Sequence, residues 1–209
     1  TSTTSVPVDK TPSKVTELTS FEAPAGQGNN YGQRIKGYVT APVSGQYTFW
    51  IAADDMADLY LSTSEDPARK TKIAYVNGWT NSREWSKHST QKSASIYLEA
   101  GKRYYIEALM LEIGGGDNLA VGWQLPNGTL ERPIAGNRLS PFSGASSTTT
   151  TEPTISSTGT GKITRDLWSG VYGSTTADVP VTKAPNHTTE HTLFESPSNV
   201  GDHYGQRLR

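Results

Sequence analysis

The sequence predicts an all-β fold, an antiparallel β-sandwich. Between residues 37 and 125, short apolar runs rich in Val, Ile, Tyr and Trp alternate with Gly, Pro, Asn and Asp. Such alternation is typical of sandwiches and barrels, and no segment shows a convincing helical periodicity. With 209 residues and 33% hydrophobic content, the chain can bury one well-packed domain plus a tail, or two small domains.

The expected strands come from five runs in the first part of the chain. They are GYVTAPVSGQYTFWI at 37–51, DLYLST at 58–63, KIAYVNGW at 72–79, SASIYLEAGKRYYIEALML at 93–111 and LAVGWQL at 119–125. The fourth run holds two strands, because Glu-Ala-Gly-Lys at 99–102 is a turn sequence. We expect residues 1–142 to form one sandwich domain.

A Ser/Thr-rich stretch follows this domain. Residues 143–161 contain few apolar side chains, so they cannot support a core and are typical of a linker between extracellular modules.

A repeat organises the rest of the chain. Residues 6–36 align without a gap on residues 179–209, an offset of 179 − 6 = 173, with 16 of 31 positions identical. The shared motif Tyr-Gly-Gln-Arg, at 31–34 and 204–207, indicates a structural role, and we expect Arg34 to pair with a buried acid such as Glu22. Residues 162–209 are therefore the N-terminal part of a second repeat.

The second repeat is too short to bury a core alone, because only residues 162–209 are present. We expect this segment to dock on the first domain or on a neighbouring chain. The stretch ITRDLWSGVYG at 163–173 lies just before the second copy. One hypothesis is that its Trp168 and Val171 fill the place of the strand that precedes the first copy.

Bulk properties exclude several classes of function. The net charge of −1 and the pI near 6.4 give no electrostatic footprint for nucleic acid. No apolar run is long enough to insert in a membrane. There are no cysteines, which excludes a disulfide framework, a zinc-thiolate site and a thiol nucleophile.

Two adjacent carboxylates, Asp54 and Asp55, follow the run that ends at Ile51. Like charges repel unless a cation or hydrogen-bond donors offset them. A solvated turn with an Asx-type hydrogen bond is the alternative interpretation. The pair is thus a candidate cation site.

The order and spacing of three motifs resemble the PA14 domain, a β-sandwich module of toxins, adhesins, glycosidases and other extracellular proteins. These motifs are YGQRIKGYVTAPVSGQYTFWIAADDMADLYLS, SASIYLEAGKRYYIEAL and GGGDNLAVGWQLPNG. In sugar-binding members, an Asp-Asp pair joined by a cis peptide holds calcium (Ca2+) together with a facing loop. The resemblance implies that Asp54 and Asp55 hold the ion, facing Gly114, Gly115, Gly116 and Asp117.

The chemistry of these residues suits calcium independently of the resemblance. Calcium takes about six to eight oxygen ligands in irregular geometry. Glycines can bend their carbonyl groups toward one point, since they accept backbone angles that other residues refuse. Asp117 would add a third carboxylate, and the remaining coordination positions would accept a glycan with vicinal hydroxyls. Separately, Gly-Gly-Gly-Asp is usually only a flexible hairpin loop.

Loop aromatic and polar residues are candidate sugar contacts. An exposed indole of Trp79 or Trp85 would stack on a pyranose ring, although burial in the sandwich is the commoner fate of tryptophan, and we expect it for Trp50 and Trp123. Further candidates for hydrogen bonds to hydroxyl groups are Asn77, Arg83 and Asn118.

No enzyme constellation is found, so we expect a non-enzymatic protein. The motifs of serine hydrolases, phosphate loops and dinucleotide sites are missing. The favoured function is a calcium-dependent carbohydrate-binding and adhesion module, extracellular or at the cell surface, repeated along its chain. The alternatives are a structural repeat of an extracellular fibre assembled by strand exchange between neighbouring copies, or an accessory module of a glycoside hydrolase.

Overall fold

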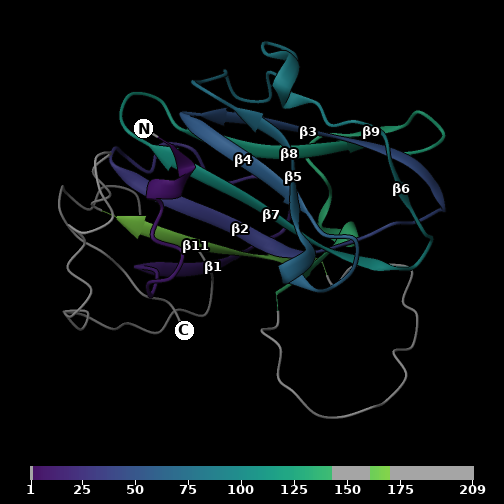
Figure 1. Cartoon of the computed structure of the whole chain (residues 1–209). Coiled ribbons are helices and arrows are strands. Elements are labelled where there is room, and N and C mark those ends of the chain that lie inside the picture. The colour runs from purple at the N-terminus through teal and green to yellow at the C-terminus, as the bar shows by residue number, and fades with distance from the viewer. Residues whose placement is uncertain (1, 143–160, 170–209) are drawn as a thin grey trace.

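Two antiparallel sheets pack face to face in the computed structural model, which describes residues 2–142 and 161–169 (Figure 1). The larger sheet has seven strands. In spatial order it runs β1 (Lys14–Leu18), β11 (Ile163–Ser169), β2 (Tyr31–Thr40), β7 (Arg103–Glu112), β4 (Met56–Leu61) and β5 (Thr71–Val76), and β10 (Leu139–Pro141) also pairs with β2. The predicted all-β sandwich is confirmed.

The smaller sheet has four strands. In spatial order these are β6 (Ile96–Leu98), β3 (Gly45–Asp54), β8 (Asn118–Gln124) and β9 (Leu130–Glu131). Within the described ranges, helical structure is limited to four single 3-10 turns: η1 (Thr3–Ser5), η2 (Pro67–Arg69), η3 (Ser89–Gln91) and η4 (Gly136–Arg138).

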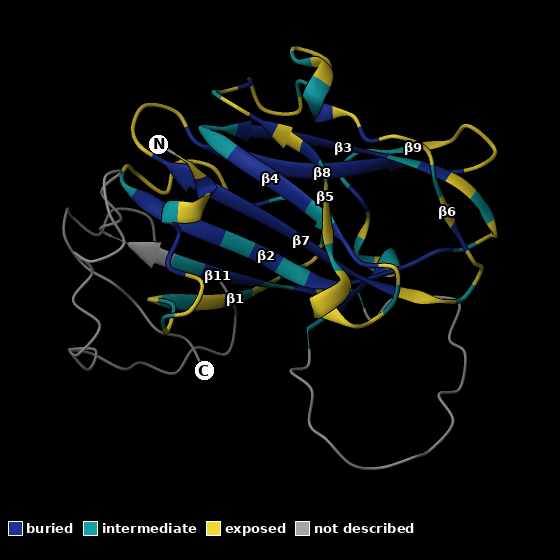
Figure 2. Ribbon diagram, viewed as in Figure 1, coloured by how far each residue is buried: buried dark blue, intermediate teal, exposed yellow. Residues whose placement is uncertain are grey.

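The core lies between the two sheets and follows the period-two alternation of their strands. Ile35 and Ile106 from the larger sheet and Phe49 from the smaller one are completely buried. The Trp123 ring packs 4.9 Å from the ring of Tyr47, centroid to centroid. Burial of each such side chain contributes about 1.5 to 3 kcal/mol. Figure 2 shows the buried residues concentrated along the central strands β2, β7 and β4.

Strand β11 places a segment from beyond the Ser/Thr-rich stretch inside the larger sheet. It pairs antiparallel with β2 on one side and with β1 on the other. Residues 143–160 of the proposed linker 143–161 lie outside the described residues, as do Val171 and the repeated segment at 179–209. The side chain of Trp168 is not described either.

The expected pairing of Arg34 with Glu22 is wrong. The Arg34 guanidinium instead binds Asp166 of β11, with its Nε at 3.0 Å and its Nη2 at 2.7 Å from Oδ2. Glu22 pairs with Arg83. Sequence reasoning missed this because Asp166 is 132 positions away, beyond the Ser/Thr-rich stretch.

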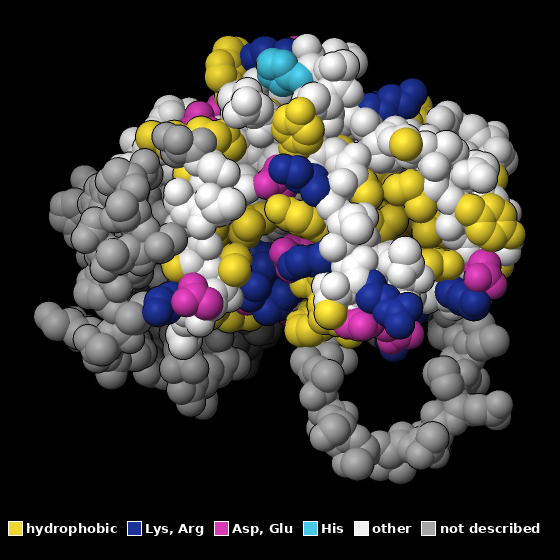
Figure 3. All heavy atoms as spheres, viewed as in Figure 1, with side chains coloured by type: hydrophobic (Ala, Val, Ile, Leu, Met, Phe, Trp, Pro, Cys, Tyr) yellow, Lys and Arg dark blue, Asp and Glu magenta, His cyan; other side chains and the backbone are white. Residues whose placement is uncertain are grey.

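The outer face of the larger sheet carries mixed charge. Basic and acidic side chains lie interspersed over β4, β7 and β2 in Figure 3. Two of the acids, Glu107 and Asp58, are nearly buried there and are neutralised by Lys70 and Lys72. No helix among the described residues is long and apolar enough to span a membrane.

Candidate functional site

The Asp54–Asp55 pair lies where the chain crosses from one sheet to the other. Asp54 ends β3 of the smaller sheet, and β4 of the larger sheet begins at Met56. The peptide bond between the two aspartates is cis. A second crossing runs alongside, because Glu112 ends β7 of the larger sheet and Asn118 begins β8 of the smaller one. Both crossings therefore meet at one end of the sandwich.

Three carboxylates converge at this point. Asp54, Asp55 and Glu112 each offer an oxygen, and these oxygens lie within 4.8 Å of one another. Such a cluster of anions is unfavourable without a compensating cation or proton. The arrangement consequently has the charge and the geometry of a cation site.

Glu112 is the most unusual member of the cluster. Its side chain is completely buried, and neither carboxylate oxygen has a well-formed hydrogen bond among the described residues. Burial first, and then the charges of Asp55, Asp54 and Asp117, raise the pKa of Glu112 to about 8, only partly offset by the approaching backbone amide of Asp55. Buried carboxylates normally have partners, so these oxygens are available to a ligand.

Asp54 experiences the same field. Burial, followed by the charges of Asp55 and Asp117, raises the pKa of Asp54, while the ammonium group of Lys87 works in the opposite direction. The cluster thus favours binding of positive charge at two of its three members.

The loop between β7 and β8, residues 113–117, which we call the glycine loop, packs against Asp54 and Asp55. The backbone amides of Ile113 and Gly114 donate to Asp55 Oδ2 at 2.8 and 3.4 Å. Gly115 has a φ of +110°, which favours glycine. A Cβ on Gly116 would lie 3.3 Å from Asp54 Oδ2. The structure therefore brings the loop against the acidic pair, with Gly116 closest to Asp54.

Asp117 lies outside the three-carboxylate cluster. Its carboxylate accepts hydrogen bonds from the backbone amides of Gly26 and Gln27 and from the Tyr31 hydroxyl, the last at 3.2 Å. These contacts fasten the glycine loop to residues 26–31. The Asn29 side chain adds a further link by accepting from the Gly115 amide at 3.2 Å.

Asn118 stands directly across from Asp54 in the β3–β8 register. Its Nδ2 donates to the Thr80 carbonyl oxygen at 2.9 Å. Its Oδ1 is buried without a hydrogen-bond partner in the described part of the chain. An amide oxygen free of partners beside a carboxylate cluster is a further potential metal ligand.

The loop after β5 forms a rim beside the acidic pair. Trp79 is 51% exposed, and its backbone forms a β-bridge with Asp54. Trp85 is only half-buried, with the Arg132 guanidinium 5.9 Å from its ring centroid. Trp50 and Trp123 are buried as expected. The rim therefore offers a half-exposed indole near the cluster, and Lys87 Nζ lies over its ring, 2.8 Å from the centroid.

Arg83 is already engaged at this rim. Its Nε and Nη2 donate to the two carboxylate oxygens of Glu22, at 2.8 and 2.6 Å. Asn77, the remaining candidate for a sugar contact, is exposed and directly follows β5. Arg83 can reach a sugar only by sharing or exchanging this bidentate ion pair.

Two residues of the site were missed by sequence reasoning. Glu112 reads as the last polar residue of an alternating strand, although its place two residues before the three glycines 114–116 was a usable signal. Asn29 carried no signal, because it reaches the loop from 86 positions away.

The donor set is all oxygen, from carboxylate and amide groups. Such donors suit hard cations, while zinc and copper sites normally include nitrogen or sulfur. The irregular arrangement at a strand crossing fits calcium better than magnesium, which demands an octahedral shell. The residues present therefore fit a calcium ion.

The comparisons with known proteins agree with this fold. The family profile described as the PA14 domain matches residues 8–137. Among curated relatives, dog (Canis lupus familiaris) fibrocystin is 32% identical over 120 residues, covering 54% of this chain and 3% of that protein. Human (Homo sapiens) fibrocystin-L is 40% identical over 79 residues, covering 38% and 2%.

A third relative is the mouse (Mus musculus) N-acetyl-beta-glucosaminyl-glycoprotein 4-beta-N-acetylgalactosaminyltransferase 1. It is 37% identical over 100 residues, covering 46% of this chain and 10% of that enzyme. The chain thus spans a small fraction of the curated relatives it matches.

Two solved structures match this chain at low similarity. The PA14 sugar-binding domain from an RTX adhesin gives a TM-score of 0.42 at 14% identity, covering 56% of this chain and 74% of that one. The Epithelial Adhesin 9 A domain from Candida glabrata, in complex with Galb1-4GlcNAc, gives 0.37 at 23%, covering 47% and 46%.

Proposed function

Because the chain belongs to the PA14 domain family, we propose that it is a carbohydrate-binding module that acts through a bound calcium ion. The observation that carries the proposal is the buried Glu112 carboxylate, which has no well-formed hydrogen-bond partner in the described part of the chain and offers an oxygen within 4.8 Å of oxygens of Asp54 and Asp55. A cation is the simplest group that satisfies all three acids at once.

The proposed ligand set differs in part from the one that the sequence predicts. Asp54, Asp55 and Glu112 supply the carboxylates, and Asn118 Oδ1 supplies an amide oxygen. Carbonyl groups of the loop Gly114–Gly116 remain part of the proposal. Asp117 holds the loop in place through its bonds to residues 26–31.

Calcium would supply Lewis-acidic coordination of sugar hydroxyls, and the chain's own residues would orient the sugar. Calcium accepts about six to eight oxygens, so the protein ligands leave positions for two vicinal hydroxyls. Trp79 supplies a half-exposed indole beside the site, and stacking of a pyranose on the ring face that Lys87 covers would require the Lys87 ammonium group to move aside. Trp85, Arg83 and Asn118 are secondary contacts in this proposal.

A binding role is favoured over hydrolysis. The three carboxylates converge on one point, whereas a glycosidase needs two carboxyl groups that flank the scissile bond. A sugar held by a few hydroxyl contacts to one ion buries little surface, so each module binds weakly and gains from repetition along its chain. We therefore propose attachment to glycans as its role.

An extracellular setting belongs to the same proposal. Extracellular calcium modules bind the ion with dissociation constants of about 10⁻⁴ to 10⁻³ M. We propose that this site binds calcium with an affinity in that range, so that it is occupied at extracellular calcium concentrations.

Calorimetric titration with calcium chloride tests the metal site. We expect one calcium per chain for the wild type and at least about a hundredfold weaker binding for Asp54→Asn combined with Asp55→Asn, since a lost carboxylate ligand costs several kcal/mol. Asp9→Asn, at an exposed acid that pairs with Lys10, is the matched control. Equal calcium binding by the double variant and the wild type would remove the site.

A glycan array with calcium or with chelator tests the sugar. We expect calcium-dependent binding that Trp79→Ala abolishes without changing calcium affinity. Tyr97→Ala is the control, because Tyr97 is similarly exposed, at 59%, but lies on β6. Glycan binding that persists in chelator would contradict the calcium mechanism.

A further inference from the structure

Strand β11 occupies a slot between β1 and β2. Its register places Thr164 opposite Lys36 and Ser169 opposite Tyr31 on β2. On its other side Lys14–Leu18 of β1 pair with Ile163–Leu167. Since the order is β1-β11-β2, β1 joins the sheet through β11. The sheet therefore depends on this strand for its continuity.

The strand fits its slot with buried side chains. Ile163 is completely buried, and a Cβ added at Gly37 would lie only 2.8 Å from its Cγ1. Arg165 is 1% exposed, and its Nε donates to Gln33 Oε1 at 2.6 Å. Such contacts are specific to this sequence and not merely to a strand of any composition.

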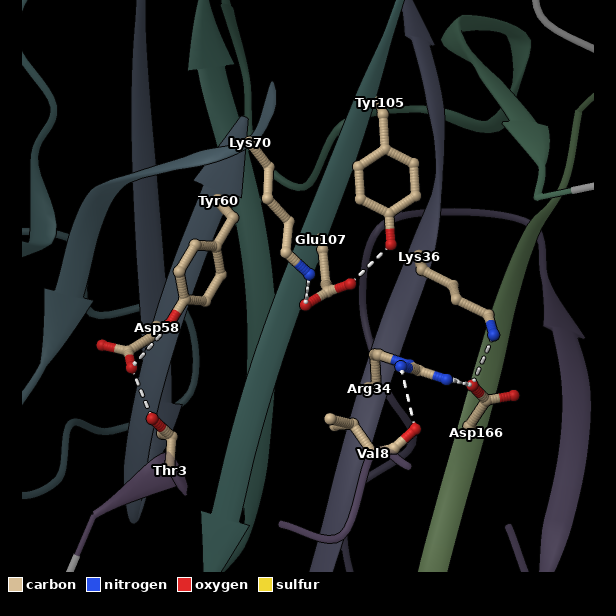
Figure 4. A network of polar contacts seen from close by, with 10 residues as sticks. All are labelled: Thr3, Val8, Arg34, Lys36, Asp58, Tyr60, Lys70, Tyr105, Glu107 and Asp166. Carbon is tan, nitrogen blue, oxygen red and sulfur yellow. Dashed lines mark hydrogen bonds and ion pairs between the residues drawn. The ribbon is translucent and has the colours of Figure 1, made fainter. Parts of the chain in front are cut away.

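Charge complementarity adds to the fit on the outer face. Asp166 is 3% exposed and accepts from Arg34 and from Lys36, whose Nζ lies 2.9 Å from Oδ2 (Figure 4). Both Arg34 and Lys36 contact the same oxygen, Oδ2, and a buried, charge-assisted contact of this kind selects for geometry and sign. The basic side chains of Arg34 and Lys36 on β2 therefore favour an acidic residue at the position of Asp166 on the incoming strand.

In the sequence, β11 lies between two copies of the motif that it contacts on β2. The contacts Gln33 and Arg34 belong to Tyr-Gly-Gln-Arg at 31–34, which recurs at 204–207. β11 lies after the first copy and directly before the second, which begins at Val179. β11 thus precedes residues 179–209, the second copy, in the sequence, but it lies in the sheet that contains β2 of the first copy, residues 6–36.

We propose that the slot between β1 and β2 is a docking surface for the strand Ile163–Ser169 of a second copy of this repeat, so that neighbouring repeats interlock by strand exchange. The occupant adds main-chain hydrogen bonds on two edges, and Ile163, Arg165 and Asp166 provide specificity. Strand addition of this kind is a general mode of peptide recognition. The repeat thereby gains an assembly function alongside its candidate sugar site.

Peptide binding to the full chain tests the proposal. In the disabled chain, the substitutions Ile163→Asp and Leu167→Asp prevent the chain's own β11 from docking in the slot. A fluorescent peptide of residues 161–169, GKITRDLWS, is then titrated with the wild-type or the disabled chain, and binding is measured by fluorescence anisotropy. A tethered strand competes at an effective concentration of about 1 mM. For a peptide Kd of about 10 µM, we therefore expect the wild-type chain to bind about 100-fold more weakly than the disabled chain.

A charge variant of the peptide is the matched control. Asp166→Lys in the peptide sets a cation against Arg34 and Lys36, and we expect binding to be lost. Equal binding of the two peptides, or equal binding by the wild-type and disabled chains, would overturn the proposal.

A crosslinking experiment decides the matter if the disabled chain does not fold. The sequence has no cysteine, so Glu17→Cys on one chain and Thr164→Cys on another, which are register partners, would form a single defined disulfide after joint refolding. We expect this disulfide-linked heterodimer to form. We expect no heterodimer when Lys102→Cys, at an exposed position away from β1, replaces Glu17→Cys. Absence of the heterodimer, or equal yield with Lys102→Cys, would overturn the proposal.

Discussion

At the residue scale, the candidate site shows what a local pattern can and cannot reveal. Asp54 and Asp55 are conspicuous in the sequence because two charges follow an apolar strand. Glu112 is not conspicuous, since a glutamate at the end of a strand ordinarily faces water. Its burial depends on the two crossings meeting at one end of the sandwich, which is information that only the tertiary fold contains.

Glu112 gives the apo-protein a distinctive pH dependence. Burial and the neighbouring carboxylates raise its pKa from the ordinary value of 4.5 in the unfolded chain to about 8 in the folded protein. A carboxyl with a raised pKa keeps its proton in the folded state, so stability is full below pH 4.5 and declines as the pH rises toward 8. In chelator, we expect the melting temperature to fall between these values, and Glu112→Gln to flatten the decline.

The control for this experiment is Glu99→Gln, at an exposed glutamate paired with Lys102. It should leave the pH profile of melting unchanged. A profile for Glu112→Gln that matches the wild type would show that Glu112 ionises normally in the folded protein.

At the scale of elements, the strands were more predictable than their neighbours. The runs from 37 to 125 correspond to the end of β2 and to β3 through β8, because dense Val, Ile and Tyr residues between turn residues have few other solutions. The segment Tyr31–Lys36 of β2 was not among these runs, and its partner β11 comes from across the Ser/Thr-rich stretch. Long-range pairing of this sort leaves no local trace.

The loop between β7 and β8 allows a sharp test of the site's geometry. A Cβ on Gly116 would lie 3.3 Å from Asp54 Oδ2, while one on Gly114 would lie 3.8 Å from Asn29 Cγ, an ordinary contact. We expect Gly116→Ala to weaken calcium binding about tenfold, equivalent to about 1.4 kcal/mol, by displacing Asp54. Calorimetric titration measures the effect.

Gly114→Ala is the matched control, with unchanged calcium affinity expected. Both substitutions remove backbone freedom from the unfolded chain, so neither should lower stability by more than about 1 kcal/mol. Equal calcium affinities for the two variants would place the ion away from Asp54 and Gly116.

At the scale of the whole molecule, the candidate site and the sandwich are one structure. Residues 54–56 connect the smaller sheet to the larger, and residues 112–118 make the return connection. An ion bound by Asp54, Asp55 and Glu112 would therefore tie both connections together. Sequence reasoning identified the pair and the facing loop separately, but the closing of the two sheets on a common point follows from the fold.

Calcium should consequently stabilise the sandwich as a unit. At a free calcium concentration 100 times the Kd, binding to the folded state adds about 2.7 kcal/mol. For a domain of about 150 residues, this raises the melting temperature by about 5 to 10 °C. We expect scanning calorimetry to show one transition that shifts as a whole, with hydrogen exchange slowed in β3 and β7 alike, and no shift for Asp54→Asn with Asp55→Asn. Protection confined to residues 113–117 would instead mean that the ion orders a loop without joining the sheets.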